Sequence, residues 1–300
     1  MTEILYEHNP EIRTIRAKIQ TFCDYWEGQF RLSDIYEYVG AKTKDEKTAV
    51  RVGLSREKGN TVEPTGSYGT WRKIDKDINW FDLSEITQNN CKCLQVEMTL
   101  NIHKLVDFFD GDMIGIEGVK SCGKTGSALE SGYRSLPYQK VNYFSSEVSL
   151  PAIQDKALKN KIPLSALKGL KYAYRTSNFH DVIEPGAFNI IDWLGAPGSG
   201  DEAHYYLIAP LLSKIHEKMN GKGLTIVCLQ KDPGKSIGDG GHKIRHKMNL
   251  ALTLDRDRQG RFWANIEECK VKPELVGYRI QYEPKPFELV PKSDWIPPNK

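Results

Sequence analysis

The sequence predicts an α/β fold, in which a mostly parallel sheet is flanked by helices and is preceded by a small domain. Two observations support this. From Leu94 onward, apolar strand-like runs alternate with helical patterns almost to the end of the chain, which is typical of a parallel sheet with helices on both faces. Residues 1–76 instead combine short helices with a hairpin pattern. Hydrophobic periodicity is lost over residues 77–93, which we interpret as a linker.

The domain boundaries follow from these patterns. The core is expected over residues 94–290, followed by a C-terminal tail at 291–300. With 300 residues, 39 % hydrophobic and 27 % charged, the chain is long enough for about two globular domains, which excludes a disordered or fibrous protein. No apolar run approaches the roughly 20 residues of a membrane span, and the N-terminus lacks a signal-peptide pattern. We therefore expect a cytoplasmic protein without a membrane partner.

The first domain is predicted element by element. Apolar residues recur every three or four positions from Glu11 to Trp26, which predicts an amphipathic helix. A short extended piece follows at 30–32, and Ser33 is expected to cap a second helix that ends at Gly40. A capping box from Thr43 to Glu46 opens a third helix.

A hairpin completes this domain. Residues 61–63 and 68–72 flank a turn rich in proline, glycine and serine. The order of helix, short strand, helix, helix and hairpin resembles a winged helix-turn-helix over about the first 75 residues. Positions 41–73 hold eight basic and four acidic residues, a net charge of +4 that suits DNA phosphates. The residues predicted to contact DNA here are Lys44, Lys47, Arg51, Arg72 and Lys73. Two alternatives stay open: an ordinary solvated face, or a winged helix that binds protein.

A glycine-rich loop carries the strongest chemical signal. An apolar strand at 112–117 runs into GVKSCGKT at 118–125 and then into a helix, which is the GxxxxGK[ST] pattern in its expected setting. In such a loop, backbone N–H groups surround phosphates and the helix N-terminus adds its positive end. The residues predicted to bind the phosphates of ATP are Gly118, Val119, Lys120, Ser121, Cys122, Gly123, Lys124, Thr125 and Gly126. Lys124 is expected to reach the β- and γ-phosphates, and Thr125 to hold Mg²⁺.

A second magnesium ligand is expected at the end of a neighbouring strand. Asp192 ends the apolar run 188–191 and is the candidate, the alternative being that it only terminates the strand. Hydrolysis also needs a group that activates water. The residue after Asp192 is Trp193, so the base does not directly follow the metal ligand. Glu147, which follows the strand-like run 141–144, is the predicted base, although it could simply begin the next helix.

Two later segments complete the predicted site. The apolar strand 224–229 ends in Gln230, whose amide is placed to contact the γ-phosphate, because strand ends converge on one crevice in such a sheet. The glycine-rich segment 231–247 has five basic and two acidic residues, a net charge of +3, and is predicted to hold single-stranded DNA through Lys243, Arg245 and Lys247. An ordinary solvated loop is the alternative.

Metal sites formed by cysteine and histidine are disfavoured. Cys91 and Cys93 do not have the spacing of structural zinc ligands, and no second pair follows them. His242 and His246 are four residues apart, but no acidic general base lies between them. We interpret the six cysteines as reduced thiols.

Taken in order, these motifs resemble the RecA-like core of the DnaB family of replicative helicases and related phage ATPases, over roughly Leu94 to Leu289. SSEV at 145–148 matches the family motif that ends in the catalytic Glu, IIDWL at 190–194 matches its magnesium-binding strand, and Gln230 is similar to its glutamine sensor. By the same resemblance, Lys270 and Lys272 would act as a basic finger on ATP bound to an adjacent subunit. The alternative is that they are edge-strand lysines.

The resemblance implies a function and an assembly. It implies an ATPase that uses ATP and Mg²⁺ and acts on DNA during replication or recombination, as a hexameric ring or a filament encoded by a phage or mobile element. Members of that family carry a helical N-terminal collar, which is replaced here by the winged-helix pattern, so helicase activity is in doubt. Two rivals stay open: a DNA-binding regulator with an ATP-controlled assembly switch, and a RecA-like recombinase.

Overall fold

The computed structural model describes residues 15–26, 28–74, 93–195, 207–232, 237–239 and 241–298. The chain forms two compact units, Met1–Glu85 and Ile86–Lys300, and each is described by itself. The linker expected at 77–93 lies outside the described residues, except for Cys93. Within those ranges, no helix is both long enough and apolar enough to cross a membrane.

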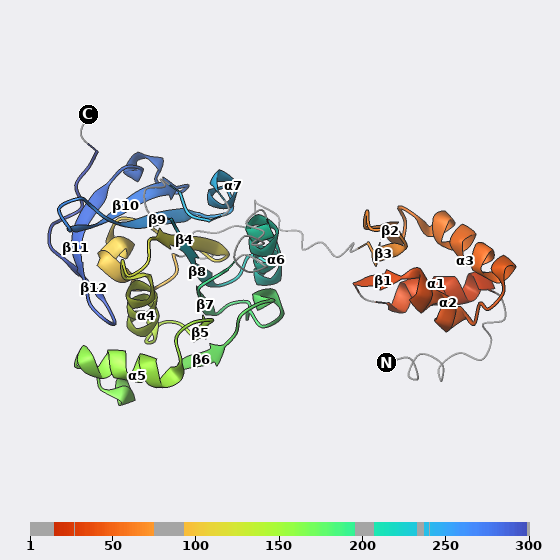
Figure 1. The fold of residues 1–300 in the computed structure, drawn as a ribbon, viewed down its shortest axis with the longest axis horizontal. Helices are drawn as coiled ribbons and strands as arrows, with labels where there is room; N and C mark the ends of the chain where they lie inside the picture. Colours follow the sequence, from red (N-terminus) through yellow and green to blue (C-terminus); the bar gives the residue numbers. More distant parts are fainter. Residues whose placement is uncertain are drawn as a thin grey trace. The chain divides into compact units, whose positions relative to one another are not determined.

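The described part of the first unit contains three helices and a three-stranded antiparallel sheet of order β1-β3-β2 (Figure 1). Its elements, in chain order, are α1 Ile15–Tyr25, β1 Gln29–Arg31, α2 Leu32–Val39, α3 Lys44–Glu57, β2 Val62–Pro64 and β3 Thr70–Lys73. This is the order that the sequence predicts, because helix caps and turn residues mark each boundary locally.

Two of the helix boundaries show this local control. Thr43 is the N-cap of α3: its hydroxyl accepts from the Glu46 backbone N–H at 3.2 Å, and Glu46 Oε2 accepts from the Thr43 N–H at 2.8 Å. The predicted cap at Ser33 is wrong. Helix α2 begins at Leu32, and its N-cap is Arg31, two residues before Ser33; the Arg31 backbone N–H donates to Asp34 Oδ2 at 2.7 Å. Asp34 thus supplies the side-chain acceptor for the backbone N–H of the N-cap residue, and Ser33 lies within the first turn of the helix.

The core of the first unit is aromatic. The Phe22 ring, 1 % exposed, lies between Trp26, Phe30 and Tyr38, with ring centroids at 4.7, 5.0 and 5.2 Å. These contacts join α1, α2 and β1 in one cluster. Burial of large rings is the main stabilising term available to so small a unit.

The second unit is built on a nine-stranded sheet of order β12-β11-β10-β9-β4-β8-β7-β5-β6. The six strands from β9 to β6 in this order are parallel, and β9 to β12 pair antiparallel. The strands are β4 Asp112–Gly118, β5 Val141–Ser145, β6 Leu170–Tyr174, β7 Phe188–Asp192, β8 Leu224–Gln230, β9 Leu250–Arg256, β10 Phe262–Cys269, β11 Arg279–Pro284 and β12 Leu289–Pro291. The mostly parallel sheet predicted for the core is therefore observed.

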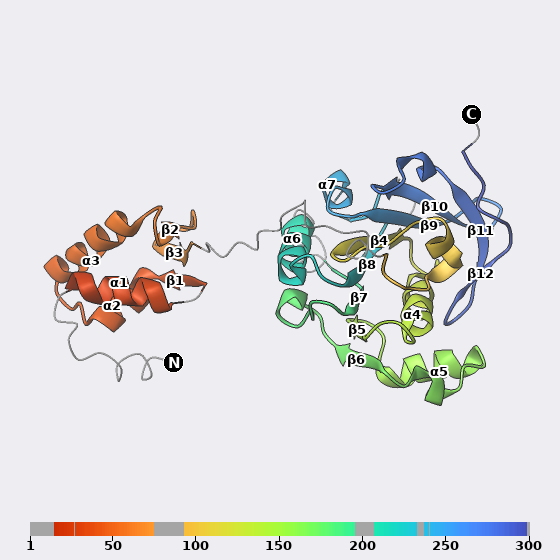
Figure 2. The same cartoon turned by 180° about the vertical axis from the view of Figure 1, so that it is seen from behind.

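Helices cover both faces of this sheet (Figures 1 and 2). Its α-helices are α4 Lys124–Ser135, α5 Leu150–Lys159, α6 Ile208–Met219 and the short α7 His242–Arg245, with 3-10 turns η2 Thr99–Lys104, η3 Leu164–Leu167, η4 Phe179–Asp181 and η7 Pro273–Leu275. Alternate side chains of β4 face opposite sides. Ile114 and Ile116 pack in the cluster that includes α4, whereas Met113 packs in the cluster that includes α6. The central strand is thus buried on both sides.

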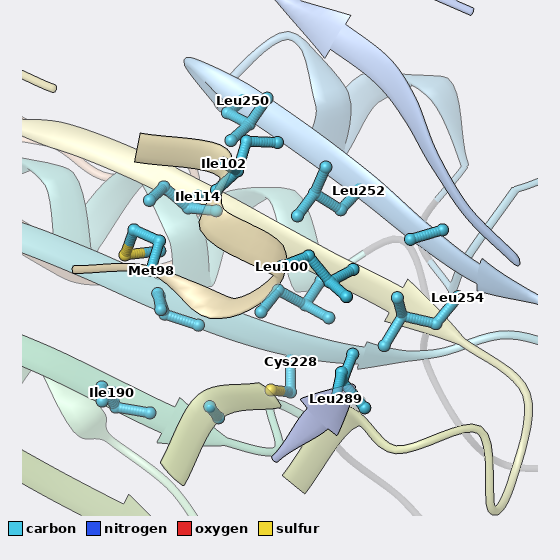
Figure 3. Packing of buried hydrophobic residues seen from close by; sticks show 14 of the residues in the cluster. Met98, Leu100, Ile102, Ile114, Ile190, Cys228, Leu250, Leu252, Leu254 and Leu289 are labelled. Atoms are coloured by element: carbon cyan, nitrogen blue, oxygen red, sulfur yellow. The ribbon is translucent and has the colours of Figure 1, made fainter. Parts of the chain in front are cut away.

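Apolar side chains anchor β4 along its length. In Figure 3, Leu250, Leu252 and Leu254 of β9 line up beside Ile114, and Leu100 and Ile102 of η2 cover them. Each of these six side chains is at most 2 % exposed. This packing immobilises the strand that leads into the glycine-rich loop.

The tail predicted at 291–300 is part of this unit as far as residue 298. Strand β12 pairs with β11, Arg279 forms a bridge with Ile296, and the Trp295 indole N–H donates to the Leu100 carbonyl at 3.2 Å. The sequence of residues 291–298 is charged and rich in proline, so it does not predict that they pack on the core. Their contacts are made with β11 and with η2, which is far away in the chain.

Replacing Phe22 with alanine tests the aromatic core. The cavity should cost about 3–5 kcal/mol, roughly the whole stability of so small a unit. We therefore expect hydrogen exchange of α1 to α3 to lose its protection, while that of the second unit stays unchanged. Tyr25→Ala, at a ring that is 68 % exposed, is the matched control and should change neither. Retained protection in Phe22→Ala would contradict the assignment of this core.

Candidate nucleotide-binding site

The glycine-rich loop joins β4 to α4 with very little free space around its glycines. A Cβ on Gly118 would lie 2.5 Å from Cys122 Sγ and 2.8 Å from the Leu254 carbonyl oxygen. Gly123 has φ of 100°, in the left-handed region that favours glycine. The Tyr282 hydroxyl donates to the Cys122 carbonyl at 2.7 Å, so β11 supports the loop from behind. The loop is therefore held in one conformation.

The Lys124 ammonium group is fully engaged within this loop. It donates to the carbonyl oxygens of Gly118 at 2.7 Å and Val119 at 3.0 Å, and to Gln230 Oε1 at 3.1 Å. These three acceptors match the three donors of an ammonium group. An incoming phosphate would compete for the same donors, and Gln230 would be the side chain released or shared.

Asp192, at the end of β7, lies beside the start of α4. It is 4 % exposed, its carboxylate accepts from the Tyr143 hydroxyl at 2.6 Å, and Thr125 is its neighbour in the pocket. Burial raises the pKa of Asp192, and the hydrogen bonds from Tyr143 and Thr125 act in the opposite direction. The predicted magnesium ligands Thr125 and Asp192 are therefore brought together.

This pair fits Mg²⁺ by the chemistry of its donors. Mg²⁺ prefers oxygen ligands and is usually held by one or two carboxylates together with phosphate oxygens and water. Thr125 and Asp192 line the same pocket, and Thr125 is near enough to lower the pKa of the Asp192 carboxyl, so both oxygens can face one ion. Tyr143, donating from β5, would orient the carboxylate.

Glu147 lies two residues beyond β5. Its side chain is exposed and lines a pocket together with Lys124 and Asp192. It is close enough to Asp192 to raise the pKa of that carboxyl. Helix α5 begins at Leu150 with Ser149 as its N-cap, so Glu147 precedes the helix and is not part of its first turn. Its carboxylate is thus available to a ligand in the pocket.

These groups surround one pocket of about 600 Å³. Its lining includes Lys120, Ser121, Gly123, Lys124, Thr125, Gly126, Glu147, Asp192 and Gln230, all of which the sequence predicts. Cys122 is buried beneath the loop instead of facing the pocket. The parallel strands bring these residues to one edge of the sheet, as expected for a doubly wound fold.

Several pocket residues were missed by the sequence analysis. The pocket is also lined by Lys156 of α5, by Trp193 and by residues 284–286, which begin at the last residue of β11. The sequence analysis also did not identify Tyr143, whose hydroxyl donates to Asp192. A tyrosine inside the apolar run 141–144 was a signal for a buried hydroxyl that needs a partner. Lys156 and 284–286 carry no local signal, because only tertiary packing brings them here.

The two predicted finger lysines lie at the far end of the sheet from the phosphate loop of their own chain. Strand β10 runs antiparallel to β9, so its C-terminal end is at the opposite edge from Gly118. Lys270 donates to the His246 carbonyl at 2.8 Å, and Lys272 pairs with Asp107 at 3.0 Å. Action on this chain's own nucleotide is therefore excluded, and a role on an adjacent subunit stays a proposal.

The basic segment after Gln230 divides into buried and exposed cations. Arg245 is 9 % exposed and pairs with Glu117 and Glu267, and Lys231 is 3 % exposed and pairs with Asp255. The predicted DNA contact by Arg245 does not fit this placement, because its guanidinium is directed into the protein. Lys243 and Lys247 are exposed, and Lys235 lies outside the described residues.

The predicted DNA contacts of the first unit lie on α3 and β3. Lys44 and Arg51 are exposed on α3, and Arg51 donates to the Tyr36 hydroxyl at 2.7 Å. Lys47 lies over the Tyr36 ring at 5.8 Å. On β3, Arg72 pairs with Glu63, and Lys73 donates to the Asp24 carbonyl. Four of the five therefore already have an intramolecular partner.

Comparisons with known proteins agree with the fold. No protein-family model matches the sequence, and neither does any curated protein. The structure is similar to a KaiC-like protein, PH0186, from Pyrococcus horikoshii OT3, with a TM-score of 0.55 and 14 % identity over 68 % of this chain and 100 % of that one. It is also similar to the RadB recombinase, with a TM-score of 0.50 and 18 % identity over 64 % of this chain and 96 % of that one. The second unit therefore has a RecA-like α/β fold.

Replacing Tyr143 with phenylalanine tests the support of Asp192. Loss of the buried donor should leave the carboxylate less well oriented, and partners of metal ligands typically contribute about 10-fold or more to metal affinity. We expect the Mg²⁺ concentration that half-saturates binding of a fluorescent nucleoside triphosphate analogue at this candidate site to rise by that factor. Tyr172→Phe, which removes a hydroxyl that donates to Val148 at 2.7 Å, is the control. Equal effects in both variants would refute a specific role for Tyr143.

Proposed function

We propose that the protein is a Mg²⁺-dependent ATPase. The observation that carries this proposal is the convergence of Lys124, Thr125, Asp192, Glu147 and Gln230 on one pocket of about 600 Å³ at the carboxyl edge of a parallel sheet. Only a nucleoside triphosphate uses a phosphate loop, a hydroxyl and carboxylate pair for a metal and a separate carboxylate for water together.

Each residue has a role that its position supports. Backbone N–H groups of the loop and the Lys124 ammonium would bind the β- and γ-phosphates. Mg²⁺, held by Thr125 and Asp192, would supply positive charge to the phosphate oxygens. Glu147, exposed to the pocket and outside any helix, would orient and deprotonate the attacking water. Gln230, which already contacts Lys124, would detect the γ-phosphate.

We further propose that the ATPase acts on DNA during replication or recombination. The RadB neighbour is a recombinase by name, which supports recombination over other uses of the fold. The exposed Lys243 and Lys247 offer cations to single strands, and the first unit offers Lys44 and Arg51 to a duplex. DnaB-like unwinding, a phage origin and a hexameric ring or filament with Lys270 and Lys272 as a finger in trans are finer parts of this proposal.

Two substitutions separate binding from hydrolysis. Lys124→Ala should abolish binding of a fluorescent ATP analogue, because the loop loses the ammonium group that would bind the β- and γ-phosphates. Glu147→Gln should retain that binding and slow turnover by about 10²-fold to 10⁴-fold, the usual contribution of a general base. Undiminished turnover in Glu147→Gln would place the base elsewhere.

DNA binding by the first unit is tested by salt dependence. The double variant Lys44→Ala/Arg51→Ala should weaken duplex binding, measured by fluorescence anisotropy, and reduce the slope of log K against log salt by about 1.8 if both residues contact phosphates. Lys159→Ala is the control, because Lys159 pairs with Asp155 on α5 of the second unit. An unchanged slope would favour the alternatives of a solvated or protein-binding face.

A further inference from the structure

The carboxylate of Glu117 is buried in the strand that leads into the phosphate loop. Glu117 is 0 % exposed and is followed directly by Gly118. A charged side chain in the central strand of a parallel sheet is costly unless it is paired and fully hydrogen-bonded. Its partners should therefore identify what this carboxylate holds in place.

Three hydrogen bonds to this carboxylate come from the segment that follows Gln230, as far as the structure describes that segment. The Gly238 backbone N–H donates to Oε2 at 2.8 Å. The Arg245 guanidinium donates from Nε to Oε1 at 3.0 Å and from Nη2 to Oε2 at 2.9 Å, which is a two-pronged, charge-assisted contact. A third nitrogen, Nη1, donates to Glu267 of β10 at 3.2 Å. Arg245 thus joins three separate parts of the chain.

The same segment is also attached at its beginning. The Lys231 backbone N–H donates to the Gly118 carbonyl at 3.1 Å, the oxygen that also accepts from the Lys124 ammonium. The Asp239 N–H donates to the Gln230 carbonyl at 2.8 Å. A movement of the phosphate loop on nucleotide binding would therefore act on Lys231, and a movement of Gln230 would act on Asp239.

Close packing makes this connection stiff. A Cβ on Gly238 would lie 3.2 Å from the side chain of Glu117 and 3.2 Å from the Gln230 carbonyl oxygen. There is little room for Glu117 to move without displacing the backbone at residue 238. Such tight contacts transmit displacement instead of absorbing it.

We propose that Arg245 is a positioning residue which, through Glu117, couples the state of the phosphate loop to the conformation of residues 237–247. This rests on the proposed nucleotide binding, and it assigns Arg245 to internal coupling instead of direct contact with DNA. The exposed Lys243 and Lys247 on either side of Arg245 are then presented to a partner in a way that depends on the nucleotide.

Hydrogen exchange of the full chain tests the proposal. A slowly hydrolysed ATP analogue with Mg²⁺ should change exchange within 237–247 of the wild-type protein by about tenfold, in the range of local opening equilibria. The variant Glu117→Gln/Arg245→Met removes both charges of the buried pair, and Glu267, which is partly exposed, keeps its hydrogen bond from the Thr253 hydroxyl at 2.8 Å. In this variant the ratio of the exchange rates with and without nucleotide should fall to one. The control Asp155→Asn/Lys159→Met removes the exposed ion pair of α5 and should keep the wild-type ratio.

The ratio distinguishes coupling from a merely structural ion pair. If the ion pair is merely structural, the double substitution changes the exchange rate by the same factor with and without nucleotide. The ratio of the two rates then stays at the wild-type value, and this result overturns the proposal. If the double variant fails to bind nucleotide, Arg245→Lys, which keeps the charge without the two-pronged contact, is measured in the same way: a reduced ratio supports coupling and a wild-type ratio overturns it.

Nucleotide binding is measured separately with a fluorescent ATP analogue, so the two proposals fail differently. A wild-type protein that does not bind the analogue overturns both. A wild-type protein that binds it, yet shows no change in exchange at 237–247, overturns the coupling alone.

Discussion

The parallel pairing of β4 with β8 and of β5 with β7 is the constraint on which the rest of the site depends. The register sets Gly118 opposite Gln230 and Ser145 opposite Asp192. Because parallel strands end at a common edge, the glycine-rich loop, Gln230, Asp192 and Glu147 lie together without any local sequence relation. A shift of one residue in either pair would turn these strands' side chains to the other face.

Burial then determines how these groups behave. Asp192 is nearly inaccessible, and its two hydroxyl partners compensate for the loss of water. Glu117 is deeper still, and the guanidinium of Arg245 compensates for it. Asp192 thus lines the pocket, whereas Glu117 already pairs with a cation of its own chain. The difference lies in which neighbouring segment covers each of them.

Much of the fold follows from local patterns. The capping box at Thr43, the apolar run before Gly118 and the run that ends at Asp192 each predict an element whose bounds the structure reproduces within about a residue. One error lies between two local signals: the Asp34 carboxylate, instead of the Ser33 hydroxyl, completes the cap of α2. The other arises from non-local contacts, through which residues 291–298 pack on β11 and η2 instead of forming a tail.

The sequence by itself determined the phosphate loop, the order of strands and helices and the candidate carboxylates, because these depend on backbone requirements and on periodicity that operate over a few residues. Only the tertiary structure decided which charges face a ligand. Arg245 and Lys231 belong to a segment that is basic in sequence, yet both are directed inward to carboxylates far away in the chain. Composition records the number of charges in a segment, whereas the free energy of each charge depends on its burial and its partners, and these are set by packing.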